Sequence, residues 1–204
     1  DMRFLLNRGY SRKNSLSLVA NRYGLSKKEQ RILYRGVYND KTIKSRMKKM
    51  VSSEFLKNKS LALDWYNVYI TVEGGFIGEI LIMCDDGFLR DIRGIYGKKI
   101  RITRYSEPLH EIFSKLSELK LGDVYIYLDA MISKSGELRA LLEEVIRDYP
   151  LNSKITTAKS PDMELIKHDI VATSDGVVID KAKMVFDLAL FVLADKDIKV
   201  ISLK

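Results

Sequence analysis

The 204-residue chain has few residues suited to soft metals or imidazole chemistry: one cysteine, two histidines and three prolines. The lone Cys84 excludes an intramolecular disulfide and a zinc cluster built from cysteines. His110 and His168 alone offer little for a zinc site or for imidazole acid–base catalysis. These shortages leave open a metal site whose ligands are oxygen atoms.

Long hydrophobic runs are also missing. No stretch approaches the ~18 consecutive apolar residues that a membrane-spanning helix needs. Arg3 and Arg8 flank only three apolar residues, so the first residues do not resemble a signal peptide. Since 46% of the residues are apolar, the chain has enough to bury a core. We expect a soluble cytoplasmic protein without a membrane partner.

The charge is divided unevenly along the chain. Residues 1–60 hold 16 Lys and Arg against 4 Asp and Glu, a net charge of +12, and the remainder holds 19 against 23, a net charge of −4. Such asymmetry is typical of a basic arm that binds a polyanion, joined to a body with its own acidic function. The alternative is a solvated, lysine-rich helical surface.

The first third of the chain has helical periodicity, and we expect a basic helical module over residues 1–58. Gly24 interrupts the pattern, and Ser26 with Glu29 forms an S-x-x-E capping box for the next helix, which gives a helix-turn-helix outline. A third helix is rich in lysine, and we expect its Lys48 and Lys49 to contact nucleic acid. A packing platform or a homodimer contact is the alternative role for this module.

Apolar runs and helical patterns alternate from about residue 60 onward. The alternation predicts an α/β domain over 59–204, with a mostly parallel sheet flanked by helices. The expected strands lie at 61–63, 79–84, 124–128, 154–157, 170–173 and 199–203, and the expected helices at 107–119, 136–148 and 181–194. The basic stretch 87–104 has no clear period and is interpreted as a hairpin or mobile loop. Its nucleic-acid-binding candidates are Arg90, Arg93, Lys98 and Lys99.

Four aspartates stand where apolar runs stop: Asp64, Asp129, Asp162 and Asp175. Parallel strands deliver such side chains to one crevice at their carboxyl ends, and clustered carboxylates repel each other unless a cation lies between them. The set therefore indicates a site for Mg²⁺ or Mn²⁺. Each aspartate taken singly has a simpler explanation as a helix cap or a first-turn carboxylate.

Several neighbouring residues leave two roles open. The Asp85–Asp86 pair is either a fifth metal-facing group or a turn. Lys134, in a Ser/Gly turn, would hold a phosphate at a helix start, whereas Ser133 or Ser135 would cap that helix. Asp180 is expected to cap the helix at 181–194.

The order of the motifs Asp64-Trp65-Tyr66-Asn67, Leu128-Asp129-Ala130, Ser160-Pro161-Asp162 and Thr173-Ser174-Asp175 resembles the PIN-like superfamily of metal-dependent ribonucleases, above all its NYN branch. The resemblance implies a PIN-like, Rossmann-like fold over residues 60–204. It makes the four aspartates the catalytic metal ligands and Asn67 the amide of the first motif. It also implies RNA as the substrate and a 5′-phosphate product. The whole chain is in addition similar to an uncharacterised archaeal family in which a basic helical module precedes such a domain.

Trp65 departs from the NYN pattern, which usually has glycine there. A bulky residue changes the path open to the loop backbone, or it provides a ring on which a base stacks.

The function predicted from these features is a metal-dependent ribonuclease whose basic helices and 90–104 loop grip nucleic acid. DNA is the alternative partner of the N-terminal module. The main alternative is a nucleic-acid-binding regulator with an inactive PIN-like domain. A phosphatase of the haloacid-dehalogenase kind is disfavoured because no D-x-D motif follows a strand. A purely structural module would bind no metal.

Overall fold

The computed structural model describes residues 1–94 and 102–203. Four short helices open the chain: α1 Met2–Asn7, α2 Arg12–Tyr23, α3 Lys27–Gly36 and α4 Asp40–Met47. Gly24 ends α2 with a left-handed φ of 60°, a conformation that glycine adopts without strain. The predicted capping box is present, because Ser26 Oγ accepts from Glu29 N and Ser26 N donates to the Glu29 carboxylate. Local sequence therefore sets where α2 ends and where α3 begins.

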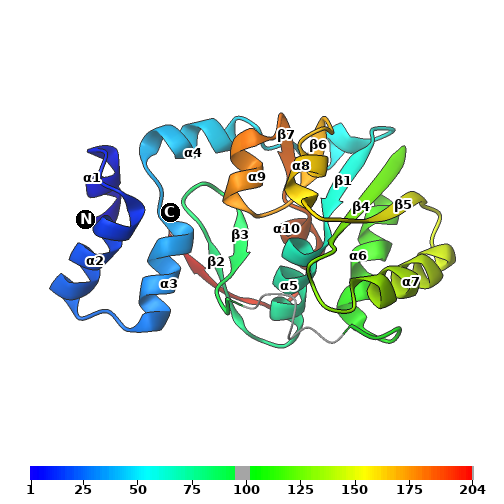
Figure 1. Cartoon of the computed structure of the whole chain (residues 1–204), viewed down its shortest axis with the longest axis horizontal. Helices are drawn as coiled ribbons and strands as arrows, with labels where there is room; N and C mark the ends of the chain where they lie inside the picture. The colour runs from blue at the N-terminus through cyan, green and yellow to red at the C-terminus, as the bar shows by residue number, and fades with distance from the viewer. Residues whose placement is uncertain (95–101, 204) are drawn as a thin grey trace.

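The helical module has little core of its own and packs against the rest of the chain. Its buried apolar cluster centres on three residues, Met2, Leu6 and Val19. On α3, Ile32 packs instead against Ile82 and neighbouring residues of the α/β body. Figure 1 shows α3 beside β2 and β3, while α4 runs along the top of the molecule toward α9. The first helices therefore form one wall of the folded unit.

The central sheet contains five parallel strands in the order β5-β4-β1-β6-β7. Their bounds are β1 Leu61–Asp64, β4 Asp123–Asp129, β5 Asn152–Ala158, β6 Ile170–Ala172 and β7 Met184–Phe186. Leu61 is in register with Val124, and Ala62 is in register with Val171. All residues of β1 are buried, as expected for the middle of a parallel sheet covered on both faces. The predicted α/β class with a parallel sheet, preceded by an all-helical module, is confirmed.

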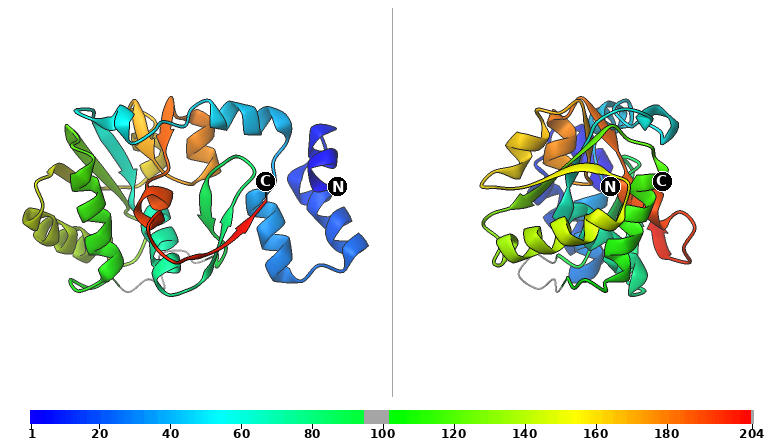
Figure 2. Two further views of the ribbon diagram at one scale, coloured as in Figure 1. Left: turned by 180° about the vertical axis from the view of Figure 1, so that it is seen from behind. Right: turned by 90° about the vertical axis from the view of Figure 1, so that its right-hand side faces the viewer.

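Helices cover both faces of this sheet (Figures 1 and 2). The larger core lies beneath α5 Trp65–Phe76, α6 Glu107–Glu118, α7 Ser135–Val145 and α10 Leu188–Leu193. A smaller core on the other side lies beneath α8 Pro161–Leu165 and α9 Gly176–Lys181. Short 3₁₀ turns lie at Glu54–Leu56 and Ile146–Asp148. No helix within residues 1–94 and 102–203 has both the length and the apolar character needed to cross a bilayer.

Two expected strands belong to a second, smaller sheet. β2 Ile80–Met83 pairs antiparallel with β3 Leu89–Asp91 and parallel with β8 Lys199–Ser202. The hairpin interpretation of the basic stretch thus holds for its first residues. Lys98 and Lys99 lie outside the described residues.

The prediction of a single helix over 181–194 is wrong. The segment contains the end of α9, then β7, then α10. β7 extends the parallel sheet beside β6, and Asp187 accepts a hydrogen bond from Leu190 N to start α10. Asp180 lies within α9 and caps no helix at 181–194. Tertiary pairing of a three-residue edge strand overrode the local helical pattern.

Candidate active site

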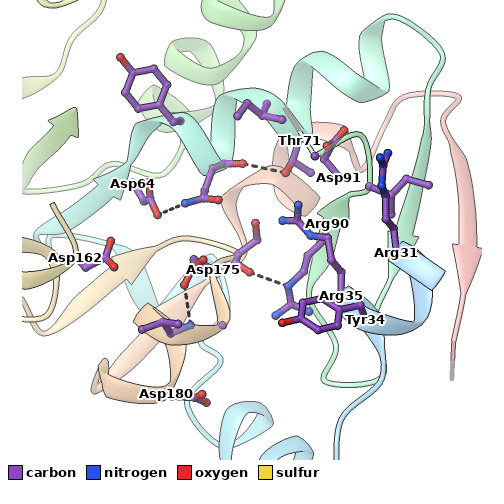
Figure 3. A pocket seen from close by; sticks show the side chains of 18 of the residues that line it. Arg31, Tyr34, Arg35, Asp64, Thr71, Arg90, Asp91, Asp162, Asp175 and Asp180 are labelled. Carbon is purple, nitrogen blue, oxygen red and sulfur yellow. Dashed lines mark hydrogen bonds between the residues drawn. The ribbon is translucent and has the colours of Figure 1, made fainter. Parts of the chain in front are cut away.

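A cleft of about 1030 Å³ lies between the helical module and the carboxyl ends of the central strands. Aspartates line one side: Asp64, Asp129, Asp162, Asp175 and Asp180. Arginine and tyrosine side chains from α2 and α3 line the other, and Figure 3 shows Arg31, Tyr34 and Arg35 across from Asp64, Asp162 and Asp175. The cleft is therefore acidic on one wall and basic on the other.

The acidic wall follows the order of the strands. Asp64 and Asp129 are the last residues of β1 and β4. Asp162 lies in the first turn of α8, after β5, and Asp175 lies directly before α9, after β6. Because β5, β4, β1 and β6 are neighbours in the sheet, the structure brings the four predicted aspartates to one edge.

Asp64 is the buried member of this group, with 6% of its surface exposed. Burial raises its pKa to about 6, and the charges of Asp175 and Asp162 add to the rise. Hydrogen bonds from Thr173 Oγ1 at 2.8 Å and Asn67 Nδ2 at 2.6 Å oppose it. Both donors contact Oδ2, so they fix the orientation of the carboxylate.

The other aspartates are more open to the cleft. Asp175 Oδ1 caps α9 by accepting from Val177 N and Val178 N, and Asp129 Oδ1 accepts from Met131 N. The second oxygen of each accepts no hydrogen bond from the residues that the structure describes. Asp162 is exposed on the surface, but its carboxyl group is partly desolvated, and this desolvation together with the charges of Asp175 and Asp129 raises its pKa. Capping and cleft lining are therefore compatible roles for one carboxylate.

The donor chemistry of this wall fits a hard divalent cation, because every side-chain donor there is an oxygen. Within residues 1–94 and 102–203, however, no three Asp, Glu, His or Cys side chains stand close enough together to hold a metal ion. Asp129 and Asp175 are half-buried, and one oxygen of each is held by backbone N–H groups; Asp162 is exposed, and Asp64 is fixed by two side-chain donors. The acidic wall thus has the chemistry for a metal but not a closed coordination shell.

Trp65 points away from the cleft. Its side chain is fully buried, stacks on Tyr69 with ring centroids 5.6 Å apart and packs against Phe113 of α6. The suggestion that it stacks on a base is therefore wrong, because no face of the ring is accessible. The bulky residue is accommodated at the start of α5, where it fills the space between the helices and the sheet.

Arg90 and the Asp85–Asp86 pair are structural. Arg90 is 2% exposed; its two Nη atoms contact Asp86 at 2.7 and 2.8 Å, and its Nε donates to the Ser174 carbonyl. Burial opposes ionisation of Asp86, but Arg90 and Arg46 lower its pKa below the ordinary value. Asp85 accepts from Tyr38 N and from Arg3. The turn interpretation of the pair holds, and these groups join the helical module to the body.

The remaining basic candidates are not gathered in the cleft. Arg93 is bonded to Asp91, Glu73 and the Ile70 carbonyl. Lys49 donates to the carbonyls of Ile179 and Asp180 in α9, whereas Lys48 is exposed outside the cleft lining.

Lys134 likewise lies outside the cleft lining, on the surface. It is paired with Glu137 and occupies the N-cap position of α7 with a φ of 67°. No side chain caps this helix, so neither Ser133 nor Ser135 has the expected capping role. The contacts of Arg90, Arg93, Lys49 and Lys134 thus lie within the protein.

The basic wall was missed in the sequence. It consists of Arg12 of α2, of Tyr38, which follows α3, and of five α3 residues: Lys27, Gln30, Arg31, Tyr34 and Arg35. These α3 positions repeat every three or four residues, so they share one helix face. That spacing could be seen in the sequence, but the sequence does not show that this helix face lies across a cleft from the aspartates.

Comparison with known proteins places the chain among families without an assigned activity. Residues 53–190 match a family described as a domain of unknown function, DUF5616, and residues 1–49 match a protein family of unknown function, DUF434. An uncharacterized protein of Methanocaldococcus jannaschii, MJ0935, is 34% identical over 190 residues, which span 92% of this chain and 91% of that protein. No solved structure matches. The chain therefore belongs to the DUF5616 family.

Proposed function

We propose that this protein is a metal-dependent nuclease that hydrolyses phosphodiester bonds at the acidic wall of the cleft. One observation carries the proposal: four carboxylates follow four neighbouring parallel strands and line a single open cleft. Like charges gathered in this way cost free energy, and the charges of Asp175 and Asp162 add to the rise that burial causes in the pKa of Asp64. A cation bound between them removes that cost, which is why such clusters favour metal chemistry.

Asp64, Asp129, Asp162 and Asp175 would hold Mg²⁺ or Mn²⁺. When bound there, the metal supplies a more acidic water and charge stabilisation at the phosphate. The chain's own contribution is orientation. Asn67 and Thr173 hold one oxygen of Asp64 in place, and the backbone of α9 holds one oxygen of Asp175. Arg90 fixes the Ser174 carbonyl, which keeps the residue before Asp175 from moving.

The PIN-like, NYN-type relationship is part of this proposal. It is supported by the order of the four acidic motifs and by a parallel sheet that carries them at strand ends. We also propose RNA as the substrate, by that resemblance alone, and the cytoplasm as the location, by composition. A second role for the helical module on DNA, or as a homodimer contact, has no comparable support from the cleft.

Cleavage by the full chain tests the proposal. A 5′-labelled mixed-sequence RNA is incubated with protein and Mn²⁺ or Mg²⁺, with and without EDTA. We expect metal-dependent cleavage that falls at least about 100-fold in Asp64→Asn and Asp129→Asn, since a metal that has lost a carboxylate ligand would stabilise the charge developing on the phosphate less well. Asp129 is only half-buried, so its variant keeps the assay meaningful if Asp64→Asn fails to fold.

Asp123→Asn is the matched control. Asp123 opens the same strand that Asp129 closes, so it lies at the opposite end of the sheet. Its variant should cleave like the natural sequence. Cleavage that survives in both site variants, or no cleavage by the intact chain on varied RNAs and DNAs, overturns the proposal. Binding without cleavage would instead support the nucleic-acid-binding regulator.

A further inference from the structure

The basic wall of the cleft has cations without acidic partners. Within the described residues, Arg12, Arg31 and Arg35 form no ion pair with any carboxylate. Arg12 donates to the Tyr34 carbonyl and Arg31 to the Arg93 carbonyl, and both acceptors are uncharged. Arg35 is half-buried beside the cleft. This contrasts with Arg46 and Arg90 in the same cleft: both pair with Asp86, and Arg46 pairs with Asp180 as well.

The two walls do not neutralise each other either. Carboxylates and guanidinium groups line one cleft, yet no ion pair among the described residues crosses from α3 to the four predicted aspartates. A ligand that fits this cleft must carry negative charge for the unpaired guanidinium groups and must also be able to bind a cation held at the acidic wall. A phosphate strand meets both requirements, because its oxygens pair with arginine and also bind a metal at the acidic wall.

The face of α3 also offers an aromatic ring. Tyr34 is 48% exposed; it follows Arg31 by three residues and Arg35 follows Arg31 by four, so the three side chains share one face of the helix. Arg12 lies over the Tyr34 and Tyr38 rings, 5.6 and 4.2 Å from their centroids. Alternating guanidinium groups and aromatic rings match a nucleic-acid strand, in which phosphates alternate with bases that stack.

The orientation of α3 is fixed by its opposite face. Ile32 packs against Ile82 in the small sheet, and Leu33 packs into the cluster of the helical module. Gly36 approaches the body so closely that a Cβ there would lie 3.3 Å from Ile82 Cδ1. The polar face with Arg31 and Arg35 is thereby held toward the cleft.

We propose that Arg12, Arg31, Tyr34 and Arg35 form the second wall of the nuclease cleft and bind the substrate strand beside the scissile phosphate. The inference rests on the proposed function and assigns the helical module to the site itself. It differs from a separate helix-turn-helix binder, because the residues that contact nucleic acid face inward from α2 and α3.

Binding and cleavage by the full chain test this wall. Affinity for a fluorescein-labelled 12-nucleotide RNA is measured by anisotropy in EDTA at several salt concentrations. Arg31→Ala/Arg35→Ala should weaken binding at least about 10-fold and reduce the salt dependence by about one to two ions. Tyr34→Ala should weaken it about 5-fold or more, and Tyr34→Phe should not, because the phenyl ring still stacks.

Lys13→Ala/Lys28→Ala is the matched control. These lysines belong to the same two helices and are exposed, and neither lines the cleft. The control should bind within about 3-fold of the natural sequence, since distributed surface charge contributes little. Equal loss in both double variants, or none in Arg31→Ala/Arg35→Ala, overturns the assignment.

Two outcomes distinguish a failure of this binding wall from a failure of the proposed nuclease function. RNA binding that depends on the two arginines, in a chain that never cleaves, overturns the nuclease and leaves the wall as a binding surface. Metal-dependent cleavage that Arg31→Ala/Arg35→Ala leaves unchanged in KM and kcat supports the nuclease and overturns the wall.

Discussion

Arg90 donates from Nε to the main-chain carbonyl of Ser174 across a distance of 2.7 Å, although 84 positions separate the two residues. The same guanidinium is paired with Asp86, which also pairs with Arg46 of α4. A buried chain of contacts therefore runs from the helical module to the residue before Asp175. The basic and acidic walls of the cleft share one internal support.

Removing Asp86 should destabilise the protein strongly. Its carboxylate is fully buried, and Asp86→Ala leaves Arg90 without a carboxylate partner among the described residues. An uncompensated buried charge costs about 3–5 kcal/mol. Urea unfolding followed by circular dichroism measures the change in the free energy of unfolding.

Asp180→Ala is the comparison for that variant. Asp180 also pairs with Arg46, but its side chain is 53% exposed. Water replaces an exposed partner readily, so we expect a loss of about 1 kcal/mol or less. A loss as large as that of Asp86→Ala would contradict the view that burial sets the cost.

Trp65→Ala should lower stability by about 3–5 kcal/mol, since it empties a large volume in a fully packed core. Trp65→Phe keeps an aromatic ring beside Tyr69 and should cost less than about 1.5 kcal/mol. It also removes a buried Nε1 that has no hydrogen-bond partner among the described residues. Urea unfolding measures both changes, and a loss for Trp65→Ala as small as that for Trp65→Phe would contradict the view that the ring fills the core.

Gly176→Ala should destabilise the protein by about 1–3 kcal/mol through steric overlap. A Cβ at this position would lie 2.8 Å from Nη2 of Arg46, whose guanidinium is buried and held by Asp86. Gly136→Ala is the control, because a Cβ there meets no atom within 4 Å. Differential scanning calorimetry should show Tm falling by several degrees for the first variant and unchanged or higher for the second.

Stability should fall as pH rises through the titration of Asp187. Burial raises its pKa to about 6, although hydrogen bonds from Leu190 N and Leu89 N and the charge of Arg90 oppose the rise and that of Asp86 adds to it. The folded state thus holds this proton more tightly than the unfolded chain. The contribution is full below the unfolded pKa of about 3.8 and is lost as pH rises through about 6.

Urea unfolding of the natural sequence and of Asp187→Asn at pH 4.5 and pH 7 measures this effect. The variant has no titrating group at this position, so the difference between the two proteins isolates Asp187. We expect the natural sequence to lose about 2 kcal/mol relative to the variant between these pH values. A difference that does not change with pH would show that Asp187 is not protonated near pH 5 in the folded state.

The alternation of strands and helices could be predicted because it follows from the local periodicity of apolar residues. The capping box at Ser26 and the strand that ends at Asp129 were predicted correctly for the same reason. The strands near 80 and 200 were also located, but not their membership of a separate sheet. Pairing partners are set by packing across the whole chain, which a local pattern does not contain.

The acidic wall could be anticipated because parallel strands necessarily bring their carboxyl ends to one edge. The fate of the basic residues could not. Arg90 appeared to be a free cation in a loop, yet it is buried against Asp86, and Trp65 appeared available for stacking, yet it fills the core. The solvent exposure of a side chain depends on neighbours that are distant in sequence, so it cannot be predicted from composition and spacing.

By itself, the sequence determined the fold class, the helix boundaries that are capped locally and the placement of aspartates after strands, since each follows from residues within a few positions of one another. Only the tertiary structure decided which charges are neutralised and which face the cleft. Arg46 meets Asp180 across 134 positions, while Arg31 and Arg35 meet no carboxylate among the described residues. Pairing between charges depends on their distance in space, and only the folded chain sets that distance.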